Sequence, residues 1–177
     1  MSDAFVENYR LLARYNHWFN QRLYAACDNL SDEERNVDRG AFFGSIHGSL
    51  NHIIWADCLW LQRLAAQGVR FASLEGAVAD LPAGATYGTM LLEDWAALRT
   101  RREQLDVAIE ECFRDMPADF PVQTVRYANM KGVQREHAAW IALTHFFNHQ
   151  THHRGQVTTL LSQAGVDPGA TDLVAMI

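Results

Sequence analysis

Four long stretches of the chain combine hydrophobic and polar residues in the pattern of helices. Near the N-terminus, Tyr9, Leu12 and Phe19 belong to an apolar series with three- and four-residue steps. This is the period of one helical face. The third stretch is rich in Ala, Leu, Glu and Arg, which also favour helices. We predict helices over residues 4–29, 45–67, 88–114 and 137–164.

The segments between the predicted helices differ in length and composition. Ser31 and Glu34 have the spacing of a capping box, which predicts a short helical turn after the first long helix. Residues 68–88 are rich in glycine and alanine without a sustained period, which indicates a long surface connection. Over residues 120–136, branched or aromatic residues alternate with polar ones, a pattern that fits a short hairpin.

This order of elements predicts an all-α protein, a four-helix bundle with long second and third connections. The chain of 177 residues is 49% hydrophobic and 20% charged, as in ordinary globular domains. Its length suits one domain over residues 1–177. The sequence ends in apolar residues, and we expect Leu173 and Val174 to pack on the helices.

Charge and hydropathy exclude several classes of partner. A net charge of −6 argues against a nucleic-acid partner, since that affinity comes mainly from Lys and Arg. No stretch is long and apolar enough for a membrane helix, and the N-terminus lacks the pattern of a secretory signal. We therefore expect a cytoplasmic protein. Cys27, Cys58 and Cys112 form no CxxC pair and are expected to be small buried residues.

Histidines concentrate in the last predicted helix, where His145, His149, His152 and His153 occur. Two imidazoles on one helix reach one ion when they are one turn apart, as in the pairs 145/149 and 149/153. On a helical projection, His153 falls within the apolar face and His149 on its edge, whereas His145 and His152 point away. The geometry favours His149 and His153 as metal ligands.

A third ligand must come from another helix, because two histidines alone bind weakly. The second predicted helix offers His47 and His52, and the period does not choose between them. Asp57 lies on the apolar face of this helix, which is unusual for a carboxylate unless it is paired or supports a site. The residues alone leave the third ligand open.

The segments LNHIIWADCLWL and NHQTHHRGQ, followed by LLSQAG, resemble the DinB family of the DinB/YfiT-like metalloenzyme superfamily. The early YNHWFNQRLY and the late TDLV extend the resemblance over nearly the whole chain. The resemblance implies a four-helix bundle, commonly homodimeric, that holds a divalent metal by three histidines. It places these ligands at His52, ahead of the acidic Asp57, and at His149 and His153.

The resemblance implies chemistry less sharply. Some relatives transfer low-molecular-weight thiols or use them as cofactors, and others are described as metal-dependent hydrolases. We expect a metal-dependent enzyme of hydrolase or thiol-transferase type with an unidentified small-molecule substrate, the alternative being a non-enzymatic structural or stress-related dimer. Imidazole ligands suit zinc, nickel, iron and copper alike, and among these metals we expect zinc or nickel first and iron next. No catalytic residue is identifiable from the sequence.

Several neighbouring residues carry separate expectations. Gln156 either orients a ligand or caps the helix, and Arg154 is expected to be a surface charge. Trp18, Trp55 and Trp60 place aromatic rings on more than one face of the first two helices. This pattern predicts a homodimer.

Overall fold

A computed structural model of the protein describes residues 2–68, 71–76 and 78–177. Within these residues the chain is mostly helical and has one two-stranded sheet. Short 3₁₀ turns lie at Ala72–Leu74, Phe120–Val122 and Leu173–Ala175. The main elements are α1 (Ser2–Cys27), α2 (Asp32–Asn36), α3 (Ile46–Ala65), α4 (Trp95–Arg114), β1 (Thr124–Ala128), β2 (Gln134–Ala138) and α5 (Ala139–Gln163).

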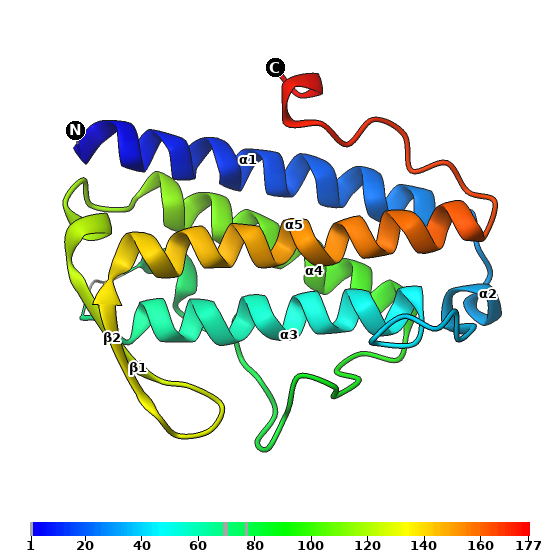
Figure 1. Ribbon diagram of the computed structural model, residues 1–177, viewed down its shortest axis with the longest axis horizontal. Helices are drawn as coiled ribbons and strands as arrows, with labels where there is room; N and C mark the ends of the chain where they lie inside the picture. Colours follow the sequence, from blue (N-terminus) through cyan, green and yellow to red (C-terminus); the bar gives the residue numbers. More distant parts are fainter. Residues whose placement is uncertain (1, 69–70, 77) are drawn as a thin grey trace.

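The four long helices lie side by side, with α1 and α5 running in one direction and α3 and α4 in the other (Figure 1). Ring contacts agree with these directions for α1, α4 and α5. Tyr9 near the start of α1 packs on Phe113 at the end of α4 and on Phe147 near the start of α5. Because α3 and α4 run the same way, the chain between them must cross the length of the molecule. This requirement accounts for the long second connection.

Helix boundaries follow from local capping. The predicted capping box forms at the start of α2, where Ser31 Oγ accepts from Glu34 N and Glu34 Oε2 accepts from Ser31 N. The third long helix starts later than the predicted residue 88, because the Asp94 side chain caps it by accepting from Ala97 N at 2.7 Å. Gly165, with a φ of +78°, ends the last helix as expected.

The hairpin predicted over residues 120–136 is present as β1 and β2, and it is the part of the fold that departs from an all-α class. Its antiparallel register pairs Val125 with His137 and Tyr127 with Arg135. The second strand ends where α5 begins, so the helix predicted from residue 137 starts at Ala139. The hairpin lies against the end of α3 and the start of α5 (Figure 1).

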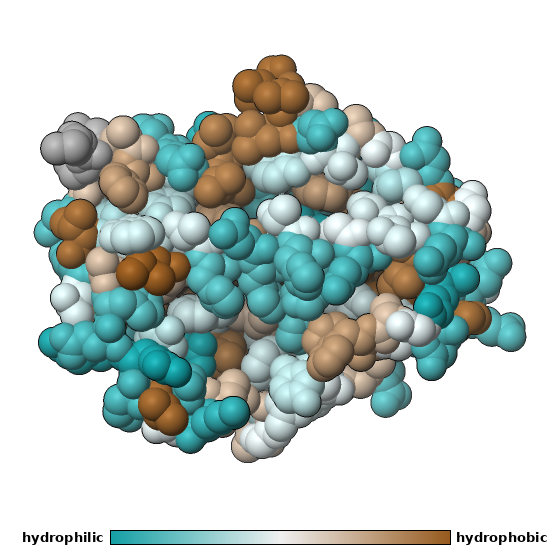
Figure 2. Space-filling view, in the orientation of Figure 1, coloured by the Kyte–Doolittle hydropathy of each residue, from teal (hydrophilic) through white to brown (hydrophobic). Residues whose placement is uncertain are grey.

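The C-terminal segment crosses α1 through backbone contacts. Tyr15 Oη donates to the Thr171 carbonyl, and Arg22 Nε donates to the Ala170 carbonyl. The expectation that Val174 packs on the helices is wrong, since this side chain is 70% exposed, whereas Leu173 is half-buried. Figure 2 shows hydrophobic side chains projecting at this end of the chain.

The interior of the helical part contains charged residues as well as an apolar core. Arg154, expected on the surface, is only 1% exposed and donates to the side-chain oxygen of Asn16 on α1. The sequence does not predict this burial, because exposed residues lie close to Arg154 along α5. None of the described helices is both long and apolar enough to cross a membrane.

Candidate metal centre

Three histidines from two helices converge on one point inside the protein. His52 comes from α3, and His149 and His153 come from successive turns of α5. The Nε2 atom of His149 lies 3.3 Å from Nε2 of His52 and 3.1 Å from Nε2 of His153. Within the described residues, this trio is the group of His, Cys, Asp or Glu side chains whose ligand atoms all lie within 4.8 Å of one another.

Two of the rings are held from behind by hydrogen-bond acceptors. His52 Nδ1 is 2.9 Å from the carbonyl oxygen of Tyr87, and His153 Nδ1 is 2.8 Å from Oε1 of Gln156. Since each acceptor requires the hydrogen on Nδ1, the Nε2 atoms of both rings present lone pairs to the shared point. Acceptors of this kind behind ligating imidazoles are usual in metal sites.

Burial keeps the imidazoles neutral. It lowers the pKa of His52 to about 4 and that of His149 to about 3, and it also lowers the pKa of His153. The other histidines add to the effect on His149 because a positive charge there would repel a charge on them. Neutral imidazole is the form that binds a metal ion.

The donor set fits a divalent transition metal. The Nε2 lone pairs of His52 and His153 both point to Nε2 of His149, at 3.3 and 3.1 Å, and a cation at this point could accept all three nitrogens as ligands. Three imidazole nitrogens suit zinc, nickel or iron, and they do not distinguish among these metals. The structure thus brings together residues that could hold a divalent cation.

Aromatic rings enclose the histidines on one side. Phe43 stacks on His52 with 3.9 Å between ring centroids and meets His153 edge-on at 5.6 Å. The loop that carries Phe43 approaches α3 closely at Gly48, where an added Cβ would lie 2.3 Å from the Phe43 carbonyl oxygen. Gly48 is therefore required for Phe43 to reach the cluster.

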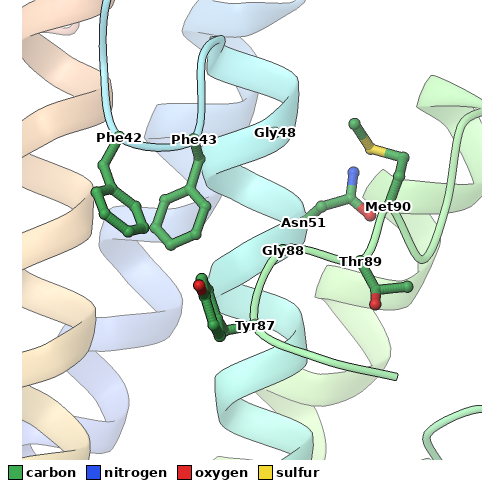
Figure 3. A pocket seen from close by; sticks show the side chains of 8 residues that line it. All are labelled: Phe42, Phe43, Gly48, Asn51, Tyr87, Gly88, Thr89 and Met90. Atoms are coloured by element: carbon green, nitrogen blue, oxygen red, sulfur yellow. The ribbon is translucent and has the colours of Figure 1, made fainter. Parts of the chain in front are cut away.

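A cavity of about 370 Å³ borders this aromatic wall (Figure 3). Phe42, Phe43 and Tyr87 lie on one side of it, and Thr89 and Met90 lie on the other. None of the described residues that line it carries a charged side chain. Because Phe43 and the Tyr87 backbone also contact His52, the cavity and the histidine cluster share part of their walls.

The structure places the remaining candidates away from the shared point. His47, the other candidate for the third ligand, is buried with Nε2 2.8 Å from the Leu92 carbonyl. His145 contacts the ring of Trp60, and exposed His152 lies near Gln156. Asp57 is paired as its position suggested, since it accepts from Arg102 Nη1 at 2.6 Å.

Of the two roles expected for Gln156, the contact with His153 corresponds to orienting a histidine of the cluster. The roles of Phe43 and Tyr87 were not predicted from the sequence. Both residues lie in irregular segments, where periodicity does not indicate the direction of a side chain or a carbonyl.

The three cysteines are free and buried as expected. Burial raises the pKa of each thiol, to about 12 for Cys27, about 11 for Cys58 and about 12 for Cys112.

Comparison with known proteins supports the resemblance noted from the histidine segments. The chain is 26% identical over 161 residues to Protein DinB of Bacillus subtilis (strain 168), which covers 91% of this chain and 88% of that protein. No solved structure matches the chain. The DinB family model matches residues 1–177 in full. The protein therefore belongs to the DinB family.

Proposed function

We propose that the protein binds one divalent metal ion through His52, His149 and His153. The observation that carries this proposal is the convergence of three Nε2 atoms, two of them fixed as lone-pair donors by the Tyr87 carbonyl and by Gln156. Zinc and nickel are the metals we expect first, and iron is the third candidate.

We further propose that the metal serves an enzyme of hydrolase or low-molecular-weight-thiol-transferase type. Three protein ligands are the usual number in catalytic zinc sites, which keep a coordination position for a substrate. A metal bound there supplies a Lewis acid beside the cavity walled by Phe43 and Tyr87. The cavity has the size of a small-molecule site, and its uncharged lining favours an uncharged part of the substrate.

The chain's own residues have three separate tasks in this proposal. The Tyr87 carbonyl and Gln156 hold the imidazole rings in one orientation and one tautomer. Phe43 covers His52 and limits access of water to that ring. Exposed Phe42 and Tyr87, with ring centroids 6.3 Å apart, stand at the mouth of the cavity, where they would meet an entering molecule.

A second function is favoured by the position of the ligands on two helices. His52 belongs to α3 and the other two to α5, so a bound metal would cross-link these helices. Such a metal would stabilise the fold without an enzyme activity, in a structural or stress-related protein. The two functions differ in whether the metal accepts a further ligand.

Substitution with cobalt separates the two functions. We expect the cobalt-loaded protein to show visible absorption bands that shift when azide or a small thiol is added, from about pH 6 to about pH 9. The His149→Ala variant should lose the bands. Absorption bands that do not shift with any added ligand would support the structural function over the enzyme. Absence of bands from the unmodified protein would contradict metal binding itself.

A further inference from the structure

A second cavity, of about 540 Å³, lies between the β-hairpin, the end of α3 and the first turns of α5. The rings of Trp60 and Tyr127 form an aromatic corner of it, with centroids 5.2 Å apart and planes at 70°. We call this cavity the hairpin pocket. Its lining includes Trp60, Arg63, Tyr127, Lys131, Arg135 and His145.

The strand register determines which hairpin side chains reach the hairpin pocket. Tyr127 and Arg135 are directly paired across the two strands, so their side chains lie on the same face. Arg126 and Glu136 form the adjacent pair and lie on the opposite face, where they bind each other at 2.9 and 3.0 Å. The hairpin therefore directs one arginine to the pocket and neutralises the other outside it.

The lining of the hairpin pocket is cationic. The described residues that line it include Arg63, Lys131 and Arg135, and none of them carries a carboxylate. In the described part of the chain, neither Lys131 nor Arg135 has an ion-pair partner, although acidic residues outnumber basic ones by 21 to 15. In Figure 2 the surface over the hairpin, at lower left, is mainly hydrophilic. The protein as a whole is acidic, whereas the hairpin pocket is locally cationic.

Side-chain and backbone bonds fix the walls of the hairpin pocket. The Arg63 guanidinium lies 4.7 Å from the ring centroid of Trp60 and 4.6 Å from that of Tyr127, and it donates to the Ala128 carbonyl. The Gln67 amide exchanges two hydrogen bonds with the Arg126 backbone, at 2.9 and 3.0 Å. These bonds attach β1 to α3, so the pocket is formed before any ligand arrives.

We propose that the hairpin pocket binds a small aromatic carboxylate. The half-buried ring of Tyr127 offers a surface on which an aromatic body can pack, and buried Trp60 backs it. Lys131 and Arg135 offer unpaired cationic groups for the carboxylate, and an arginine can bind it through two hydrogen bonds. The proposal does not require a metal at the histidine cluster.

The hairpin pocket is a neighbour of the candidate metal centre. His145 lines the pocket, with its ring centroid 5.0 Å from that of Trp60 and 5.8 Å from that of His149. Since a carboxylate is also a metal ligand, a test must distinguish binding in the pocket from binding to a metal.

Isothermal titration of the full-length protein with 2-naphthoate tests the proposal, with the neutral 2-naphthamide as the matched probe. We expect saturable binding of 2-naphthoate and binding of 2-naphthamide weaker by about tenfold or more. The double variant Lys131→Gln, Arg135→Gln should weaken 2-naphthoate binding about tenfold, because two exposed charge contacts are lost. Arg126→Gln removes a cation from the other face of the same hairpin, so it should bind 2-naphthoate like the unmodified protein.

The variant His149→Ala separates the pocket from the metal centre. Retained 2-naphthoate binding by this variant supports the hairpin pocket. The proposal would be overturned if His149→Ala lost binding while the Lys131, Arg135 double variant kept it, since the probe would then be bound at the metal. Equal affinity for 2-naphthamide, or no binding of 2-naphthoate at about millimolar concentration, would also overturn it.

Discussion

At the scale of single residues, Arg102 balances the charge of the protein interior. Its guanidinium pairs with Asp57 at 2.6 Å and with Asp106 at 3.0 Å, and all three side chains are at most 2% exposed. Burial opposes the charge of Arg102, but the neighbouring Asp106 and Asp57 raise its pKa. Asn16 and Asn20 also donate to Asp106, and Gln150 donates to Asp57. This network joins side chains from all four long helices.

Replacement of Arg102 by Met should therefore destabilise the protein strongly. Two buried carboxylates would lose their cation, and we expect the free energy of unfolding to fall by about 3–5 kcal/mol in urea denaturation. The control is Arg126→Met, whose exposed pair with Glu136 should contribute no more than about 1 kcal/mol. Similar losses in the two variants would refute the importance of the buried network.

At the scale of elements, a polar clamp on α3 positions the loop that supports the metal centre. The Asn51 side chain accepts from Leu92 N at 2.9 Å and donates to the Leu92 carbonyl at 3.0 Å, and His47 contacts the same carbonyl. Upstream in this loop, the Tyr87 carbonyl holds His52. The clamp explains why His47 and Asn51 are buried beside a histidine of the cluster without belonging to it.

Replacement of Asn51 by Leu should release this loop. We expect faster amide hydrogen exchange and faster protease cleavage over residues 86–92, since the backbone of Leu92 loses its partners. Metal affinity should fall roughly tenfold, because His52 would be held less firmly. Glu93→Gln, an exposed change on the same loop outside the clamp, serves as control. Unchanged exchange in the Asn51 variant would mean that the clamp is not what holds the loop.

The sequence predicted the long helices well, because periodic apolar faces and capping residues act locally. The capping box at Ser31 and the end of α5 at Gly165 are confirmed. The spacing of His149 and His153 identified a pair that the structure brings together, whereas the choice of His52 over His47 needed the family resemblance. The features that the sequence did not predict depend on tertiary contacts. Arg154 is buried against a helix that is distant in sequence, and the contacts of Phe43 depend on how its loop crosses α3.

At the scale of the whole molecule, the histidine cluster links folding to pH. The pKa of His52 is lowered to about 4 and that of His149 to about 3, whereas unfolded histidine titrates near about 6.5. Below this pH the unfolded chain takes up protons that the folded metal-free protein does not, so the free energy of unfolding falls as pH falls. Buried Asp106, whose pKa is raised to about 6, acts in the opposite direction.

A comparison with a double variant isolates the histidine contribution to this pH dependence. On going from about pH 7 to about pH 5.5 in the presence of a chelator, the unmodified protein should lose more stability than the His52→Gln, His149→Gln variant. Urea denaturation at the two pH values measures the difference. Equal losses would show that these imidazoles are not held neutral by the fold.

The expected homodimer stays a prediction at this scale. The distribution of tryptophans on more than one helical face predicts it. Trp55 and Trp60 are buried within a single chain, at 5% and 9% exposure, so their burial needs no partner. The exposed apolar residues Val174 and Ile177 at the C-terminal end are a more direct reason to measure the oligomeric state.

We propose that His52, His149 and His153 together hold one metal ion. Elemental analysis of untagged protein, purified after growth with zinc, nickel and iron supplied, tests it most directly. We predict about one divalent ion per chain, and loss of that ion when any of the three residues is changed to Ala. His145→Ala, which removes a histidine one turn away on the same helix, should retain it. Full metal content in His149→Ala, with loss in His145→Ala, would contradict the assignment.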